Sequence, residues 1–452
     1  MLKKAFLPFI LLGSLACACT PTRRLERFCG HRLSREIRTS TVFSKSFSGF
    51  TLLDPESGKT WCDVNGQHLF TPASTTKILT LYTCLHTLGD TLPRLRYEFY
   101  EGDRSEPEGA WAVSGTGDPT FLHPAFAAWQ PRPMFFAQHP YSMQYLFNQP
   151  GVAQQSRWGK GWAWDDFNED YSPEISGLPL FGNCLKLSIL NGKWVVSPRR
   201  FQDSIQLNPD LEDIRQKPFS GLLEVPLSAN HYTGSTPVYV PVFDPANRLL
   251  PSMNDSLHLN LANLNASMMF KSSPGNRIWR VTPTDTVYRR MMYQSDNFIA
   301  EQLLLMCAEA RFGYMLQDSM IHWAKDSLFA TLPQAFRWVD GSGLSRYNLN
   351  SPRNLAEILH RLWKEQPQEQ LFSLFPIGGI SGTLVDWYKG KDGKPYIFAK
   401  SGSMSGVQCL SGFVVNKHGK ILIFSFMHNN FTGSGKPWKL EMQRLLELIR
   451  DR

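Results

Sequence analysis

The pattern of hydrophobic residues changes twice along this chain, and the change separates two kinds of structure. Residues 101–280 are dense in Pro, Trp, Tyr and Gly, and their helical periodicity is weak, whereas helical spacing is clear on both sides. Short runs inside this stretch, such as KLSILNGKWVVS, TPVYVPVF and SLHLNLANL, are typical of strands. We therefore expect a body formed by residues 40–100 and 281–452, interrupted by a mostly β insertion at 101–280.

The first part of the body follows a polar segment that ends near residue 40. FSGFTLLD and KTWCDVNGQHLF flank PESG, which predicts a strand, a turn and a second strand. The next segment, STTKILTLYTCLHTL, places Ile78, Leu81, Tyr82 and Leu85 on one face of a helix.

The second part of the body has the same mixture of elements. DTVYRRMMYQSDNFIAEQLLLMCAEARF and SPRNLAEILHRLWKEQ carry helical periodicity, and two apolar runs joined by NKHG predict a hairpin. KPWKLEMQRLLELIRDR predicts a closing amphipathic helix.

The N-terminus has the composition of an export signal. MLKKAF is basic, AFLPFILLGSLA is apolar but too short to span a bilayer, and ACA supplies a small-residue exit. We expect residues 1–18 to be a signal peptide and the protein to lie in a periplasm or on the outer face of a membrane. Cys17 or Cys19 is a candidate for lipid attachment, and plain cleavage is the alternative.

Charge and cysteine content narrow the possible partners. The 47 Lys and Arg residues exceed the 39 Asp and Glu residues, but no block of like charges predicts a nucleic-acid arm. Six further cysteines lack C-x-x-C spacing, so buried free thiols, with at most one disulfide, are expected rather than a metal site. No cofactor or metal is expected, since no H-E-x-x-H motif or cluster of His and Cys is present.

Ser74 and Lys77 form the only Ser-x-x-Lys pair in the chain. Side chains at positions i and i+3 of a helix share a face, so a desolvated Lys77 amine can take the proton of the Ser74 hydroxyl. The helix N-terminus also offers backbone N–H groups to a developing oxyanion. The alternative is structural: Ser74 caps the helix and Lys77 is solvated.

A second hydroxyl and amide are expected from a Ser-x-Asn motif. Ser228/Asn230 and Ser252/Asn254 lie in the irregular insertion and are expected to be turn residues, whereas Ser295 and Asn297 lie between two helical runs, where a loop can face a cleft. The alternative for Asn297 is a helix cap.

A third group is expected at the end of a strand. Lys400, Ser401 and Gly402 form the only Lys-[Ser/Thr]-Gly in the chain. A cation and a hydroxyl on an edge strand can bind a terminal carboxylate and align a peptide as an added strand. The alternative is an exposed lysine that protects the edge.

These three motifs occur in the order found in serine acyl-transferases of the penicillin-binding and β-lactamase type. The chain resembles the D-alanyl-D-alanine carboxypeptidase/endopeptidase family, the class C low-molecular-weight penicillin-binding proteins of peptidase family S13, over nearly all of residues 45–450. GTGDPTF, GWAWDD, DGSGLSRYN, GGISGTL and AKSGSMSGV also look like this family. The resemblance implies an α/β (α+β) fold with an antiparallel sheet flanked by helices and a large insertion between the first two motifs.

The resemblance also implies a role for each motif residue. Ser74 would be acylated, Lys77 would act as its base, Ser295 would relay a proton and Asn297 would hold the substrate amide. Peptidoglycan stem peptides would be the substrates and β-lactams would be covalent inhibitors. The residues that would bind the substrate are Lys400, Ser401 and Gly402, with Ser403 and Ser74 supplying the oxyanion N–H groups.

Two more residues are assigned through the resemblance. Asp166 would face the amino end of a diaminopimelate side chain, and Arg346 its carboxylate, with a surface acid and a capping arginine as alternatives. Ser401 replaces the usual Thr, which keeps the hydroxyl and removes a methyl group. No acidic residue can be nominated as a dedicated deacylation base, which argues for a β-lactam target rather than a resistance enzyme.

Two other functions stay open at this point. One is an esterase or β-lactamase on the same fold, and the other is a silent wall-binding lipoprotein that uses the aromatic-rich insertion on glycan. An α/β-hydrolase lacks support because the chain has no G-x-S-x-G motif.

Overall fold

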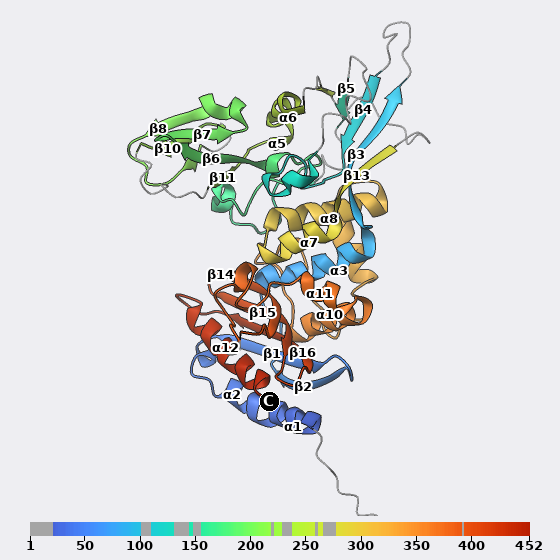
Figure 1. Cartoon of the computed structure of the whole chain (residues 1–452), viewed down its shortest axis with the longest axis vertical. Coiled ribbons are helices and arrows are strands. Elements are labelled where there is room, and N and C mark those ends of the chain that lie inside the picture. Colours follow the sequence, from blue (N-terminus) through green and yellow to red (C-terminus); the bar gives the residue numbers. More distant parts are fainter. Residues whose placement is uncertain are drawn as a thin grey trace, which may run out of the picture.

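A computed structural model describes residues 21–100, 110–130, 144–147, 155–217, 221–227, 237–257, 261–264, 277–390 and 393–452. The expected signal peptide and Cys17 and Cys19 lie outside these residues. Figure 1 shows two parts stacked along the long axis, a lower body of sheet and helices and an upper part rich in strands. Within the described ranges, no helix has the length and apolarity needed to cross a membrane.

The body is built on one antiparallel sheet with the strand order β14-β15-β16-β1-β2. Both predicted hairpins are confirmed, and their partnership is non-local: the N-terminal hairpin pairs through β1 with β16 from the end of the chain. The strands are β1 Phe47–Asp54, β2 Lys59–Val64, β14 Ile397–Met404, β15 Val407–Val415 and β16 Ile421–Asn429.

Helices cover both faces of this sheet, because the central strands are apolar on both sides. One face packs against the predicted helices of both sequence segments, and the other packs against the two ends of the chain. The first group is α3 Lys77–Thr87, α7 Thr284–Tyr293, α8 Asn297–Phe312, α9 Gln317–Asp326, α10 Pro352–Glu365 and α11 Gln368–Ser373; the second is α1 Pro21–Arg27, α2 Ser34–Arg38 and α12 Lys436–Arg450.

Helix α3 lies at the centre of the body and is buried far beyond the one face that its periodicity predicts. Leu79, Thr80 and Cys84 are as buried as Ile78 and Leu81. A helix that is buried on nearly all sides has a fixed position, so its N-terminus is a rigid place for reactive groups.

The segment before residue 40 differs from the expectation of a polar lead-in. Residues 21–38 are helical, and Leu25, Cys29, Leu33 and Ile37 are buried against the sheet. The many arginines of this segment hide the stripe, because their charged ends stay at the surface while apolar residues spaced by four face inward.

The insertion is mostly β, as expected, and contains three small sheets with the orders β12-β5-β4-β3-β13, β11-β6-β7 and β8-β10-β9. Its own hydrophobic core lies around Leu187, Val225 and Met253. Its elements are β3 Thr91–Tyr100, β4 Ala110–Gly115, β5 Gln144–Phe147, β6 Cys184–Leu190, β7 Lys193–Ser197, β8 Ile205–Asn208, β9 Arg215–Gln216, β10 Leu223–Pro226, β11 Val238–Pro241, α5 Pro245–Arg248, α6 Leu250–Leu257, β12 Leu261–Leu264 and β13 Arg277–Pro283.

The chain leaves the body along β3 and returns along β13, and these two strands pair antiparallel. Arg94 of β3 is fully buried beside them. Its guanidinium donates to Asp118 Oδ2 (3.0 Å), Thr120 Oγ1 (2.9 Å) and Thr282 Oγ1 (3.0 Å). One buried ion pair therefore ties the outgoing strand, the returning strand and the loop after β4 together at the root of the insertion.

Candidate active site

Ser74 and Lys77 meet at the start of α3. Ser74 lies in a 3-10 turn, Ala73–Thr76, and Lys77 is the first residue of the helix that follows. Lys77 is fully buried, and its Nζ donates to Ser74 Oγ (3.1 Å), Asn297 Oδ1 (2.6 Å) and the Ser342 carbonyl (2.8 Å). The alternative of a solvated lysine is wrong. No side-chain capping bond is formed at this helix start, so Ser74 is not a cap.

Burial lowers the pKa of Lys77 to about 8, against the opposing charges of Glu301, Asp340 and Asp296. A neutral amine has two N–H donors and one lone pair. With Asn297 Oδ1 and the Ser342 carbonyl placed to accept the two N–H groups, the lone pair is left for the proton of Ser74. The geometry therefore allows Lys77 to activate the Ser74 hydroxyl as a nucleophile near neutral pH.

The second predicted motif forms the turn between α7 and α8. Asp296, rather than Asn297, caps α8, because its side chain accepts from the Ile299 N–H at 3.0 Å. Asn297 is thus free to face Lys77 with its Oδ1, and its Nδ2 donates to the Tyr171 carbonyl at 3.0 Å. Ser295 adopts a left-handed φ of 56°, which sharpens the turn that presents its hydroxyl.

Lys400 lies on β14, at the edge of the sheet, yet its side chain is fully buried. Its Nζ donates to Ser295 Oγ (2.9 Å) and to the Ser401 carbonyl (2.7 Å). The alternative of an exposed lysine that protects the edge is therefore wrong. Burial first, and then the charge of Lys77, lower the pKa of Lys400.

The rest of the third motif borders the nucleophile. A Cβ built on Gly402 would lie 3.0 Å from the Ser74 nitrogen and 2.7 Å from the Pro72 carbonyl oxygen, so only glycine allows β14 to approach the turn this closely. Ser401 Oγ hydrogen bonds with Thr383 Oγ1 (2.7 Å), and Ser403 is exposed on the same strand. The three predicted motifs are thus brought together around Ser74.

Asp166 and Arg346 lie on two loops near these motifs. Asp166 Oδ1 accepts from the Tyr171 hydroxyl at 2.8 Å, and the carbonyl of Tyr171 is the one bound by Asn297. Arg346 is exposed and donates to the Ser405 carbonyl (3.1 Å) in the turn between β14 and β15, so it does not cap a helix. Neither residue contacts a motif side chain directly: Asp166 is connected to Asn297 through Tyr171, and Arg346 contacts the turn that follows the third motif.

Sequence reasoning missed the carboxylate behind the lysine. Glu301 is fully buried on α8, and its oxygens accept from the N–H groups of Ser342 (2.7 Å) and Gly341 (3.0 Å). These bonds hold the Ser342 carbonyl toward Lys77. Burial and the charge of Asp340 raise the pKa of Glu301. The available signal was spacing, because Glu301 lies four positions after Asn297 on the same helix.

Asp340 was also missed, and it links the insertion to this loop. Its Oδ1 accepts from the Gly343 N–H (2.9 Å), and its Oδ2 accepts from the Ser345 N–H (2.7 Å) and from Trp162 Nε1 (3.0 Å). Trp162 belongs to the insertion, so one buried carboxylate joins the two parts of the chain next to Lys77.

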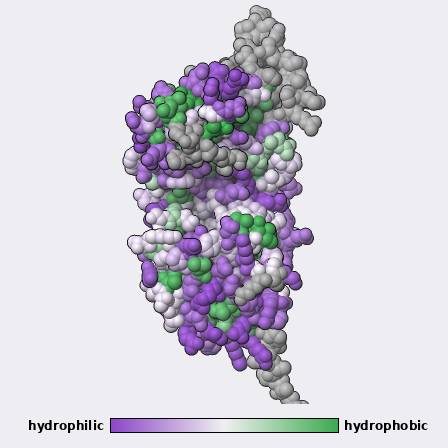
Figure 2. Space-filling model, turned by 60° about the vertical axis from the view of Figure 1, so that its left-hand side comes forward, coloured by the Kyte–Doolittle hydropathy of each residue, from purple (hydrophilic) through white to green (hydrophobic). Residues whose placement is uncertain are grey.

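The second motif opens onto a cavity of about 230 Å³ that also borders the insertion. Ser295 and Asn297 line it from the body, and Asp170, Tyr171 and Tyr239 line it from the insertion. In the space-filling view the surface is hollowed at mid-height, between the two parts (Figure 2). A substrate chain therefore has space beside the Ser295 and Asn297 side chains.

A serine next to a buried lysine, a Ser-Asp-Asn turn and a lysine on the edge strand of an antiparallel sheet define a serine acyl-transferase of the penicillin-binding type. The chain belongs to the D-Ala-D-Ala carboxypeptidase 3 (S13) family, whose model matches residues 32–447. The recognition from sequence and the expected fold class are thereby confirmed.

Individual relatives agree with this assignment. The chain is 31% identical over 181 residues to the D-alanyl-D-alanine carboxypeptidase DacB of Haemophilus influenzae, covering 37% of this chain and 36% of that protein. It is 31% identical over 160 residues to carboxypeptidase DacB of Mycolicibacterium smegmatis, covering 33% of this chain and 34% of that one. The matched segments thus span about a third of the length of these curated relatives.

Solved structures show the same fold over most of the chain. Penicillin-binding protein 4 (dacB) from Haemophilus influenzae superposes with a TM-score of 0.72 at 20% identity, covering 93% of this chain and 99% of that chain. The same protein complexed with a β-lactam superposes with a TM-score of 0.67 at 18% identity.

Proposed function

We propose that this protein is a serine D-Ala-D-Ala carboxypeptidase and DD-endopeptidase that cleaves peptidoglycan stem peptides through an acyl-enzyme on Ser74. The observation that carries the proposal is the Lys77 amine, fully buried and 3.1 Å from Ser74 Oγ, with acceptors for its two remaining N–H groups. S13 family membership agrees with this activity.

In acylation, neutral Lys77 takes the proton of Ser74 as Oγ attacks the carbonyl of the D-Ala–D-Ala peptide bond. The oxyanion would receive the backbone N–H groups of Ser74 and Ser403, a role supported by the close packing of Gly402, the neighbour of Ser403, on the turn that holds Ser74. The carbonyl carbon gains a bond to Oγ and becomes tetrahedral.

The leaving amine needs a proton before the C–N bond breaks. Ser295 Oγ accepts from Lys400 Nζ at 2.9 Å, so its own hydroxyl proton is available to the nitrogen of the departing D-alanine. The proton that Lys77 took from Ser74 then replaces the one that Ser295 gave away, and Lys77 becomes neutral again. Water then attacks the ester, with Lys77 again as base, and restores Ser74.

Substrate alignment would use the edge of the sheet. The stem peptide would lie antiparallel to β14 as an added strand, with its terminal carboxylate at Lys400 and Ser401 and its amide at Asn297. We assign Asp166 and Arg346 to the side chain of the third stem residue, because Asp166 accepts from the Tyr171 hydroxyl and Arg346 donates to the Ser405 carbonyl in the turn after β14.

β-Lactams would acylate the same serine and leave slowly, and stem peptides would be the natural partners. The basic, apolar N-terminus supports export to the periplasm or the outer face of a membrane, with lipid attachment at Cys17 or Cys19 as a further proposal.

The test uses the purified chain and a fluorescent penicillin. Wild-type protein is expected to form a stable covalent adduct and to release D-alanine from a pentapeptide. Ser74→Ala is expected to do neither, whereas Ser44→Ala, a change at an exposed serine of the same body, is expected to do both. Equal labelling of Ser74→Ala and wild type would refute the proposal. Rapid turnover of nitrocefin would favour the β-lactamase alternative, and no labelling of wild type the silent wall-binding one.

A further inference from the structure

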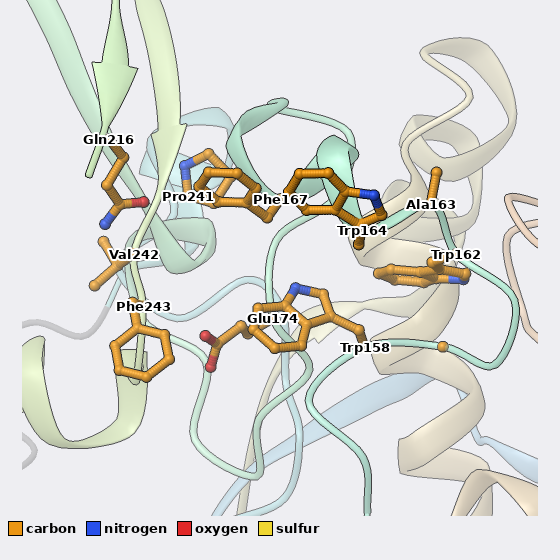
Figure 3. A pocket seen from close by; sticks show the side chains of 11 residues that line it. Trp158, Trp162, Ala163, Trp164, Phe167, Glu174, Gln216, Pro241, Val242 and Phe243 are labelled. Carbon is orange, nitrogen blue, oxygen red and sulfur yellow. The ribbon is translucent and has the colours of Figure 1, made fainter. Parts of the chain in front are cut away.

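A second cavity lies in the insertion and is not part of the site described above. Its volume is about 320 Å³, which is the size of a small-ligand pocket. Figure 3 shows aromatic rings arranged around it, with the carboxylate of Glu174 between Trp158 and Phe243. The residues that line it are Trp158, Gly159, Trp162, Ala163, Trp164, Phe167, Glu174, Gln216, Pro241, Val242 and Phe243.

One ring of this cavity, that of Trp164, is more exposed than a purely structural role explains. Trp164 is 84% exposed, although burying the large apolar surface of a Trp side chain would lower the free energy. Trp158, Trp162, Phe167 and Phe243 form the walls beside it. Five aromatic residues surround one opening and provide a flat apolar surface. Such a surface is typical of a site that a ligand covers.

Two buried polar side chains complete the cavity. Glu174 is 3% exposed and Gln216 is 5% exposed. Glu174 already accepts from the Asp244 N–H (3.2 Å) and pairs with Arg157 (3.5 Å), and burial raises its pKa to about 7. Because its charge has a cationic partner, the cavity does not demand a cation, and its polar groups serve as hydrogen-bonding groups.

Flat aromatic walls with a few hydrogen-bonding groups suit a pyranose ring. One face of such a ring presents C–H groups that pack on an indole, and its edge presents hydroxyl and acetamido groups that bond to a carboxyl or an amide. Trp162 and Trp164 offer the stacking surface, and Glu174 and Gln216 offer the polar partners.

The cavity is also adjacent to the catalytic groups. Trp162, which forms one wall, donates to Asp340, and the Lys160 carbonyl accepts from Ser345 Oγ at 2.6 Å, so this wall contacts the loop at residues 340–345 that borders Lys77. Further along the insertion, the backbone carbonyl of Tyr171 accepts from Asn297 Nδ2. These contacts connect the cavity wall to the residues around Lys77, so a sugar and the stem peptide attached to it could contact both sites at once.

We propose that this aromatic cavity binds an N-acetylated sugar ring of the glycan strand that carries the stem peptide. The inference rests on the proposed function, since it assigns the glycan part of the same substrate. It predicts that the protein prefers stem peptides that are attached to sugar over free peptides of identical sequence.

The binding test uses the full chain carrying Ser74→Ala, which is expected not to turn over substrate. The probe is a soluble tetramer of N-acetylglucosamine, and its binding is measured by saturation-transfer NMR. Transfer to the sugar is expected, and Trp164→Ala and Phe243→Ala are expected to abolish it. Phe47→Ala removes a ring that is 38% exposed on β1 of the body and does not line the cavity, so it is expected to keep the transfer. Equal transfer in all variants, or none in the parent, would overturn the proposal.

A kinetic comparison separates this proposal from the proposed function. Trp164→Ala is expected to lower kcat/KM for a disaccharide pentapeptide about fivefold to tenfold, with little change for the free pentapeptide. Because Trp164 is exposed, its loss should not unfold the protein. Equal losses on both substrates would refute the glycan site. Sugar binding without cleavage of either substrate would refute the peptidase and leave the site standing.

Discussion

The amine of Lys77 has three oxygen neighbours but, when neutral, only one lone pair. Its protonation state therefore determines whether it can accept a proton from Ser74. While it is protonated, Nζ donates to Ser74, Asn297 and Ser342 at once. Only after it loses a proton can it accept from Ser74. The rate of acylation should therefore follow the neutral fraction of this one amine.

We expect the acylation rate with a fluorescent penicillin to rise with pH through a midpoint near 8, the pKa to which burial lowers Lys77. At pH 7 the rate should be about tenfold below its plateau, since about a tenth of the amine is neutral there. Glu301→Gln removes a charge that favours the ammonium form, so its midpoint should move to lower pH. A rate that is constant between pH 6 and pH 9 would contradict this assignment.

Lys77→Arg supplies a sharper test of the same residue. Arginine keeps the positive charge but cannot act as a base, so acylation should fall by roughly 10²–10⁴-fold at every pH. Stopped-flow labelling measures the loss, and circular dichroism checks that the variant is folded. An unchanged rate would show that another group takes the proton of Ser74.

At the scale of elements, the pairing of β3 with β13 depends on a buried ion pair. Arg94 and Asp118 are 0% and 1% exposed, and Arg94 also bonds to Thr120 and Thr282. Such a pair is costly to bury, but it is more costly to break, because one charge remains without its partner. The root of the insertion is therefore held in part by a contact in which neither partner can be removed without leaving the other unpaired in the interior.

We expect Asp118→Ala to lower the free energy of unfolding by about 3–5 kcal/mol, measured by urea denaturation. The matched control is Asp255→Ala, which breaks the Arg200–Asp255 pair, whose side chains are 57% and 61% exposed. Its loss should cost under about 1 kcal/mol. Similar losses for the two variants would show that the buried pair has no special role.

At the scale of the whole molecule, the body and the insertion have separate hydrophobic cores. The cysteines of the described residues sample both: Cys184 lies in the insertion, and the other five lie in the body. All six are free and buried, which confirms the expectation of buried free thiols. Burial raises the pKa of Cys62 and Cys409 to about 12, so these thiols are unreactive while the fold is intact.

We expect the insertion to open at a lower urea concentration than the body, because its core is smaller. Pulsed thiol labelling with mass spectrometry should then find Cys184 modified before the other five thiols. Cys184→Ser should remove the early label and leave the later ones unchanged. Simultaneous labelling of all six would show that the two parts unfold as one unit.

Much of this architecture was predictable because it depends on short-range patterns. Both hairpins of the body, the helix after Ser74, the closing helix and the β character of the insertion follow from periodicity and turn residues within a few positions. Residues 21–38 were missed because basic side chains mask a narrow apolar stripe. The exact division into domains stays a prediction, and β13 runs across the proposed boundary at residue 280.

The sequence by itself determined the candidate groups Ser74, Lys77, Ser295, Asn297 and Lys400, since their types and order imply one chemistry. Only the tertiary structure decided that Lys77 and Lys400 are buried, and that the carboxylates of Glu301 and Asp340 lie near Lys77. Local patterns report which residues share a face of one element. The desolvation and pairing that set a pKa come from segments far apart in the chain, so they exist only once those segments have packed together.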